Sequence, residues 1–248
     1  MSVQYPLAQA MASAPLAPRL TFGEEVVKFV RTKPLGAGGA LVILAMLFVA
    51  LFAETLARYD PYRGDYALQF ARPSAEHWFG TDEFGRDVLT RIMYGARIAL
   101  FVGFTASFAG CTLGALLGVL SAYWGGTVEL LLERLMDILL AFPQLILALA
   151  IASILGPAVQ NVVIAIAIPV IPRVARVVRA TALAVKEYQY VEAVHALGAS
   201  RRRVVLQHII PNVMAPYLIM LTAQLGSAIL AEAALSYLGL GTAEPTPS

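Results

Sequence analysis

Residues 186–211 bring acids, two histidines and three consecutive arginines together in an otherwise apolar sequence. The stretch predicts a short helix with one apolar and one ionisable side. The apolar side holds Tyr190, Val191, Val194 and Leu197, and the ionisable side holds Glu187, Glu192 and His195. Gly198 is typical of a residue that ends a helix, and Ser200 is suited to cap a second one. We therefore expect two short amphipathic helices joined by a tight bend, the second ending before Pro211.

The three arginines of this stretch fall in the first turn of the second expected helix. Cations at a helix N-terminus oppose the helix dipole, at a cost of about 0.3–1 kcal/mol each. Arg201, Arg202 and Arg203 must therefore be favoured by something else. Three causes fit: anionic lipid headgroups, an acidic partner surface, or the positive charge that fixes membrane topology, which is the simplest.

The composition is that of a membrane protein. The 248 residues are 59% hydrophobic and 14% charged, and the mean hydropathy is +0.73, whereas a soluble domain is about one quarter charged. The single cysteine, Cys111, lies in an apolar run, so neither an intrachain disulfide nor a metal site is expected. We predict an all-α, polytopic transmembrane helical bundle.

Five apolar runs are long enough to span a bilayer, which takes about 20 residues. They are 35–57, 98–123, 130–155, 159–178 and 213–238. Residues 1–34 are interpreted as an N-terminal tail, partly disordered near Pro15 and Pro18. Residues 58–97 are interpreted as a loop with a short helix, and 98–248 as the core of the protein.

Lysine and arginine predict the orientation, because they are enriched in cytoplasmic loops. Basic residues exceed acids between the last two spans, whereas the 58–97 loop is balanced. The 180–211 loop and the N-terminal tail are therefore expected in the cytoplasm, and the 58–97 loop outside.

Several residues within the spans have more than one interpretation. Gly110, Gly114 and Gly118 recur at every fourth position and predict close packing, either inside this chain or with another subunit. Gln224 and Glu232 are polar residues of the last span, and we expect them to face a translocation path. An ion pair between Arg134 and Asp137 is expected at the start of the third span.

The 186–211 stretch resembles the Glu-Ala-Ala loop of bacterial ABC importer permeases. That pattern is Glu-Ala-Ala, three residues, Gly, nine residues, Ile, one residue, Leu-Pro. Here Glu192-Ala193, Gly198 and Pro211 match it, and Val194, His208 and Ile210 depart from it at unchanged spacing. Further segments resemble the C-type permeases of the dipeptide and oligopeptide branch. They are residues 79–91, residues 235–241, Arg134, Asp137, Phe142 and Pro143.

The resemblance implies a type I ABC importer permease fold in the bacterial inner membrane. It implies a translocation path shared with a second permease of B type, two ATP-binding subunits and an extracytoplasmic substrate-binding protein. ATP and Mg²⁺ would be bound by the ATPase subunits, with no cofactor and no nucleic acid on this chain. ATPase coupling would rest on Glu192, Ala193, Leu197, Gly198, Ala199 and Arg201. The branch carries dipeptides, longer peptides, glutathione-like molecules, nickel complexes or opines.

Two other classes of protein fit the sequence less well. An ion-driven secondary transporter predicts inverted repeats and paired ionisable residues in mid-span, and only Glu232 comes near that pattern. A membrane-embedded enzyme needs a histidine or carboxylate cluster within the spans, whereas His77, His195 and His208 all fall outside them. The sequence also lacks a Walker-type phosphate loop, so the chain is not expected to hydrolyse ATP itself. The branch would have a sixth span, so either the sequence is truncated after Ser248 or the final span is missing.

Overall fold

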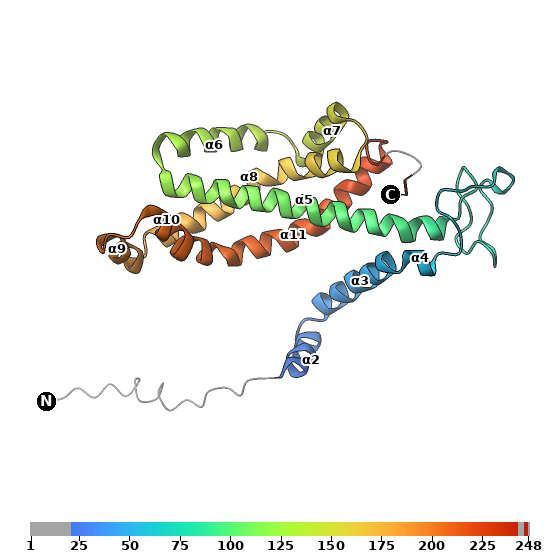
Figure 1. The fold of residues 1–248 in the computed structure, drawn as a ribbon, viewed down its shortest axis with the longest axis horizontal. Helices are drawn as coiled ribbons and strands as arrows, with labels where there is room; N and C mark the ends of the chain where they lie inside the picture. The colour runs from blue at the N-terminus through green and yellow to red at the C-terminus, as the bar shows by residue number, and fades with distance from the viewer. Residues whose placement is uncertain (1–20, 243–245, 248) are drawn as a thin grey trace. The chain divides into compact units, whose positions relative to one another are not determined.

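The computed structural model describes residues 21–242, 246 and 247, and they form helices and loops (Figure 1). Within these residues the only β-type pairing is an isolated bridge between Thr81 and Asp87, which confirms the predicted all-α class. The disorder predicted near Pro15 and Pro18 lies outside the described residues. The chain divides into two units, residues 1–46 and residues 47–248.

The first unit contains helix α2 (Phe22–Thr32) and most of helix α3 (Pro34–Leu51). α3 is the predicted first span, and it ends at Leu51 instead of residue 57. A separate turn of helix, α4 (Ala53–Leu56), follows after Phe52. The described part of the tail contains α2, a helix of eleven residues that was not predicted from the sequence.

The second unit is built on three long helices. They are α5 (Val88–Trp124), α8 (Val159–Lys186) and α11 (Ile210–Tyr237), which lie side by side in Figure 1. Residues 57–87, with the short helix η1 (Tyr66–Leu68), form a lobe at one end of these helices. α9 (Gln189–Ala196) and α10 (Arg201–Val204) lie at the opposite end. The two loops therefore lie at opposite ends of the bundle, as the predicted topology requires.

Two of the long helices extend beyond the predicted spans. α5 begins at Val88, so the first ten residues of this helix were assigned to the loop ending at 97. Its start is set by Asp87, whose carboxylate accepts a hydrogen bond from the Thr90 N–H at 2.8 Å. α8 likewise continues to Lys186, and both Pro169 and Pro172 are buried inside it.

The predicted third span, 130–155, is wrong as a single helix. It consists of α6 (Gly126–Leu140) and α7 (Gln144–Leu155), which meet at an angle of 90°. Pro143 is the N-cap of α7 with φ −56° and ψ 134°, outside the helical region. A proline also disfavours the helical conformation of the residue before it, which is Phe142 here. The described residues therefore contain four apolar helices of spanning length, or five if the bent pair counts as one span.

The glycines of α5 pack inside this chain, which confirms the first of the two predicted interpretations. A Cβ atom at Gly110 would lie 2.7 Å from the Ala167 carbonyl oxygen of α8, and one at Gly114 would lie 2.6 Å from that of Ile171. Both distances are too short for a side chain. The backbones of α5 and α8 therefore approach as closely as small residues allow in a membrane helix pair.

Candidate functional site

Helix α9 ends where the sequence predicts, at a Schellman motif around Gly198. The Gly198 N–H donates to the His195 carbonyl at 2.9 Å, and the Ala199 N–H donates to the Val194 carbonyl at 3.2 Å. Gly198 has φ +80°, a left-handed conformation that glycine adopts without a Cβ penalty. The bend between α9 and α10 is therefore fixed by the backbone itself.

The second helix starts as predicted but does not end before Pro211, so that part of the prediction is wrong. The Ser200 hydroxyl accepts a hydrogen bond from the Arg203 N–H at 3.4 Å and caps α10. Helical structure then continues through a π-helical segment, η2 (Val205–Ile209), into α11. Residues Arg201–Tyr237 thus form one apolar helical stretch, and the bend at Gly198 is attached directly to the last span.

The π-helical segment explains how helical structure passes Pro211. Proline has no N–H and its ring crowds the carbonyl of the preceding turn, so it needs a first-turn position or a widened turn. Pro211 sits near the N-terminus of α11 directly after η2. The Asn212 side-chain amide donates to the His208 carbonyl at 2.6 Å, which satisfies an acceptor in this irregular turn.

The residues predicted to couple to an ATPase lie on the outer surface of this end of the molecule. Glu192, Ala193, Gly198 and Arg201 are exposed, Ala199 is half-buried, and Leu197 is 87% exposed. Leu197 was expected on the apolar side with Val191, which is fully buried. That grouping is wrong, because Leu197 is the C-cap, where the chain has left the helix and turned outward.

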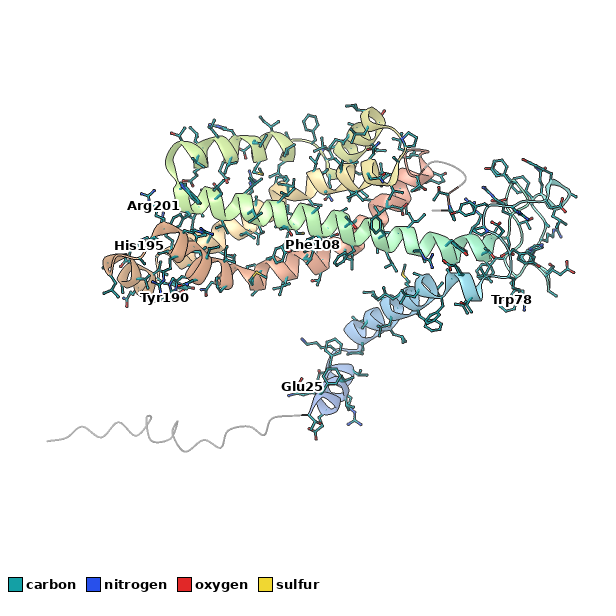
Figure 2. The ribbon with its side chains drawn as sticks, in the orientation of Figure 1. Glu25, Trp78, Phe108, Tyr190, His195 and Arg201 are labelled. Atoms are coloured by element: carbon teal, nitrogen blue, oxygen red, sulfur yellow. The ribbon has the colours of Figure 1, made fainter. Side chains whose placement is uncertain are left out.

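Aromatic and polar contacts hold α9 against the spans. The His195 ring stacks on Tyr123 of α5 at a centroid distance of 6.4 Å, and the Tyr190 and His208 rings lie 5.9 Å apart. The Tyr190 hydroxyl also accepts a hydrogen bond from Asn212 of α11 at 3.0 Å. Figure 2 shows Tyr190, His195 and Arg201 at this end of the bundle. Sequence reasoning placed Tyr190 on the apolar side of the helix but missed its contacts with His208 and Asn212, and it missed the contact of Tyr123 with His195.

Ion pairs join α6 to α8 near the point where α8 leads into α9. Arg179 pairs with Glu129, and its Nε lies 3.3 Å from a Glu133 carboxylate oxygen. Arg176 pairs with Asp137. The predicted pair between Arg134 and Asp137 is therefore wrong. The partner of Asp137 is Arg176 of another helix, and the spacing of residues within one helix could not identify it.

The two residues predicted to face a translocation path are buried among the helices of this chain. Gln224 and Glu232 are each 3% exposed, and the Ser236 hydroxyl donates to the Glu232 carboxylate at 2.8 Å. Their assignment to the path stays a prediction. An open cleft of about 290 Å³ lies elsewhere on α11, beside Ser227, Ala231 and Ala234, with Gln144 from α7 on its wall.

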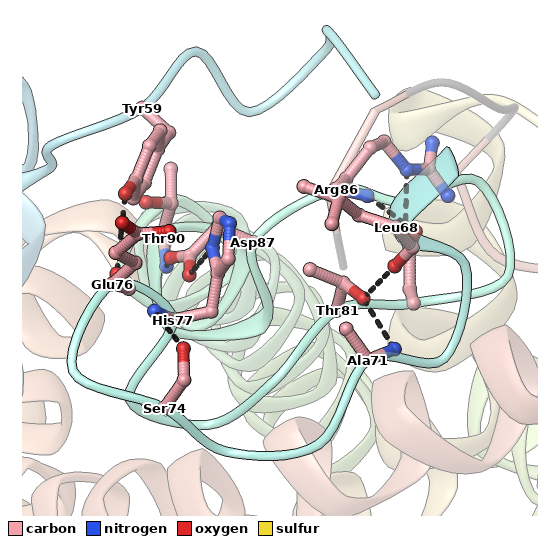
Figure 3. Close-up of polar contacts among 11 residues, drawn as sticks. Tyr59, Leu68, Ala71, Ser74, Glu76, His77, Thr81, Arg86, Asp87 and Thr90 are labelled. Carbon is pink, nitrogen blue, oxygen red and sulfur yellow. Dashed lines mark hydrogen bonds and ion pairs between the residues drawn. The ribbon is translucent and has the colours of Figure 1, made fainter. Parts of the chain in front are cut away.

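The 57–87 lobe is held together by its own polar groups (Figure 3). The Asp82 carboxylate accepts hydrogen bonds from the backbone N–H groups of Phe84 and Arg86 at 2.9 Å, and from the Arg86 Nε at 2.7 Å. Burial acts to raise the pKa of Asp82, but the hydrogen bonds from Arg86 and Phe84 outweigh it, so the pKa is lowered. The charged groups of the lobe are thus bonded to one another and to its own backbone.

Asp87 has a similar role at the base of the lobe. Its two carboxylate oxygens contact the His77 Nδ1 at 2.9 Å and the Thr90 N–H at 2.8 Å. Burial acts to raise the pKa of Asp87, and the hydrogen bonds with Thr90 and His77 more than compensate, so its pKa is also lowered. Asp87 therefore joins the lobe to the first turn of α5.

Residues 110–247 match the family of binding-protein-dependent transport system inner membrane components. The matched region begins within α5 and contains α9, the Gly198 bend and α11. The chain belongs to this family. The family consists of transport permeases of the bacterial inner membrane, not enzymes, and the apolar helices of this chain agree with such a place.

Individual permeases extend the likeness over most of the chain. A dipeptide transport system permease protein of Alkalihalophilus pseudofirmus is 41% identical, across 90% of this chain and 73% of that protein. A probable D,D-dipeptide transport system permease protein of Escherichia coli is 38% identical, across 90% and 75%. A glutathione transport system permease protein of Shigella dysenteriae is 39% identical, across 88% and 72%. The resemblance to the peptide branch that the sequence motifs indicate is thereby confirmed.

Proposed function

We propose that this chain is the permease subunit of an ATP-driven importer of peptides or related small solutes. It forms the translocation path together with a second permease of B type. Two ATP-binding subunits drive it, and an extracytoplasmic substrate-binding protein delivers the solute. ATP and Mg²⁺ are bound by the ATP-binding subunits. The names of the similar permeases support dipeptides, D,D-dipeptides or glutathione as the kind of solute.

The observation that carries the proposal is the combination of an exposed surface with a continuous helix behind it. Glu192 and Leu197 point to solvent at the Gly198 bend, and α10 continues through η2 into the last span. Val191 and Val204, one from each side of the bend, are fully buried against the bundle. A force applied to α9 by an ATPase subunit is therefore transmitted to α11 without a flexible linker.

The contacts of α9 with α5 and α8 provide a second route by which a force on α9 reaches the spans. His195 stacks on the C-terminal part of α5, and α8 leads into α9 through Glu187 and Tyr188. Since α5 and α8 pack backbone to backbone, they respond as one body. We infer that closure of the ATPase subunits tilts α5, α8 and α11 together and opens the path to the opposite side, a rigid-body switch between two states.

The test is ATP-dependent uptake of a radiolabelled dipeptide by the complete importer in proteoliposomes. Leu197→Asp places a charge where we expect a desolvated apolar anchor, and interface anchors are worth at least about 2 kcal/mol. We expect uptake and dipeptide-stimulated ATP hydrolysis to fall at least about tenfold, with the assembled complex still recovered in detergent.

Glu187→Ala is a matched control for Glu192→Ala, because both carboxylates are exposed and Glu187 lies only five residues before Glu192. We expect Glu192→Ala to lower coupled ATP hydrolysis and Glu187→Ala to leave it unchanged. Full ATP-dependent uptake by both Leu197→Asp and Glu192→Ala would disprove the coupling role. Uptake driven by an ion gradient without ATP would disprove the importer assignment as a whole.

A further inference from the structure

Helix α2 has a strongly divided surface. Phe22, Val26, Phe29 and Val30 recur at intervals that place them on one side of an α-helix. Lys28 and Arg31 fall on the opposite side. The helix begins with a capping arrangement in which the Thr21 N–H donates to the Glu24 carboxylate at 2.8 Å. It is thus a well-formed amphipathic helix of eleven residues.

The apolar side of α2 is not used to build the protein core. The helix contributes no buried residue, and its large apolar side chains are exposed by 43% or more. Phe22 is 83% exposed and Val27 is 52% exposed. A row of large apolar side chains at such exposure marks a surface that is covered by something else.

The position of α2 in the chain indicates what covers it. Only Lys33 separates α2 from α3, an apolar helix of spanning length. The Phe29 ring reaches α3, because a Cβ atom added at Gly36 would lie 3.2 Å from its Cζ. An eleven-residue helix is about 16 Å long, so a helix joined this closely to a membrane span cannot leave the vicinity of the bilayer surface.

The charges of α2 also fit a position on the bilayer surface. Glu24 and Glu25 lie in its first turn, and the basic residues Lys28, Arg31 and Lys33 follow toward the span. Basic groups next to a span are attracted to anionic lipid headgroups. A helix that has a large apolar side and a strongly charged opposite side is the type that lies in the plane of the interface.

We propose that α2 is an interfacial anchor on the membrane surface at the N-terminal end of α3. Its apolar side, with Phe22, Val26, Phe29 and Val30, enters the boundary between headgroups and acyl chains. Lys28 and Arg31 face the aqueous side, and Lys33 contacts anionic headgroups at the junction with the span. The anchor fixes where the first span enters the bilayer. It does not depend on the solute or on coupling to ATP.

The experiment places one nitroxide label at a time on α2 in the assembled importer, in a Cys111→Ala background. Labels replace Phe22, Val26 and Val30 on the apolar side, and Glu25, Lys28 and Arg31 on the polar side. The importer is placed in nanodiscs of phosphatidylcholine with phosphatidylglycerol, and collisions with oxygen and with a nickel chelate are compared. We expect oxygen contact to dominate at the apolar positions and nickel contact at the polar ones.

Two outcomes overturn the proposal. Equal nickel contact on both sides of the helix places α2 in water. Protection of the apolar positions from both reagents identifies a protein partner instead of lipid. Neither outcome bears on ATP-dependent uptake, so failure of this inference is distinguishable from failure of the proposed function.

A pair of variants sharpens the result. Val26→Asp combined with Val30→Asp should raise the nickel contact of a label at residue 22 by about threefold or more, because the helix can no longer bury its apolar side. Thr32→Asp adds a carboxylate on the polar side and should leave that label unchanged. Lys33→Gln should abolish most of any difference between nanodiscs with and without phosphatidylglycerol, because Lys33 is the cation that contacts the headgroups. A difference that survives this replacement contradicts the role of Lys33.

Discussion

The 57–87 lobe and the α9–α10 bend lie at opposite ends of the same bundle, and they use charge in opposite ways. In the lobe, Arg86 and Asp87 are buried and Asp82 is half-buried, and the three are bonded to each other, to His77 or to the backbone. At the bend, Glu192 is exposed and forms no ion pair among the described residues, and Leu197 is 87% exposed. The charged groups of the lobe therefore bond within it, whereas those of the bend stay exposed, as the proposed coupling role requires.

The two regions also differ in how their backbone polar groups are hydrogen-bonded. The lobe has little regular structure, and side chains satisfy part of its backbone; Thr81, for example, bonds the Ala71 N–H at 2.9 Å and the Leu68 carbonyl. The bend satisfies its backbone through the Schellman motif and the Ser200 cap of α10. Its outward side chains remain available, and a substitution there should change transport before it changes folding.

The largest effect on stability is expected from Arg86→Ala in the lobe. The substitution removes the buried Arg86 guanidinium from the half-buried Asp82, which keeps Arg91 at 3.5 Å, so the loss should approach the figure of about 3 kcal/mol for a broken buried ion pair. We expect hydrogen exchange of the lobe amides to accelerate by about a hundredfold. Arg63→Ala is the control, because the Arg63–Asp60 pair is 3.7 Å long with an Arg63 side chain 89% exposed, and such pairs contribute under about 1 kcal/mol. Equal exchange in the two variants would contradict the distinction between buried and exposed charge.

Acid should weaken the lobe through the same carboxylates. The pKa values of Asp82 and Asp87 are lowered by folding, so their contribution is fully present above the unfolded value of about 3.9 and is lost as pH falls through the lower folded value. The protein has two tryptophans, and Trp78 lies in the lobe with Arg58 5.1 Å from its ring. In a Trp124→Phe background, denaturant titration of Trp78 fluorescence should show lower stability below about pH 4. Asp82→Asn and Asp87→Asn should flatten this pH dependence, and an unchanged slope would refute its cause.

Gly198→Ala should have a smaller effect on stability and a larger one on coupling. A Cβ at a left-handed position costs about 1–2 kcal/mol, and no other atom lies within 4 Å of that position. Gly239→Ala is a matched control, because Gly239 follows the C-terminus of α11 with φ +75° and equally open surroundings. We expect similar losses of stability by thermal unfolding, but reduced ATP-dependent uptake only for Gly198→Ala. Reduced uptake in both variants would show that strain, and not the place of the bend, is responsible.

The sequence predicted the parts of this comparison that depend on neighbours along the chain. Apolar runs located the spans, and Gly198 and Ser200 located the bend, because helix ends are set by residues within one turn. The glycine period of α5 predicted close packing, although the choice between this chain and another subunit needed the position of α8.

The errors came from contacts between distant residues and from prolines. Asp137 pairs with Arg176, 39 residues away, and no local pattern identifies that partner. Pro143 breaks a helix, whereas Pro169, Pro172 and Pro211 are accommodated. The difference depends on burial and on the π-helical segment before Pro211, neither of which the residue type reveals. Leu197 was misplaced because the helix ended one residue before it.

The smallest effect is expected where the bend is tied to the last span. The Asn212 amide donates both to the Tyr190 hydroxyl and to the His208 carbonyl, and a net hydrogen bond contributes about 1 kcal/mol. Asn212→Ala should accelerate exchange of the α9 amides severalfold and leave the lobe amides unchanged. Tyr190→Phe removes only one of the two bonds and should have about half that effect.

The double variant shows whether Asn212 and Tyr190 stabilise α9 through the single hydrogen bond that they share. If Asn212 holds α9 chiefly through Tyr190, Asn212→Ala should add little to Tyr190→Phe, because the shared bond is already absent. Additive effects would mean that Asn212 acts through the π-helical segment and its His208 carbonyl instead. Either way the lobe should not respond, since the lobe and the bend lie at opposite ends of the bundle, too far apart for this small change to pass between them. A change in lobe exchange in the Asn212→Ala variant would contradict the independence of the two regions.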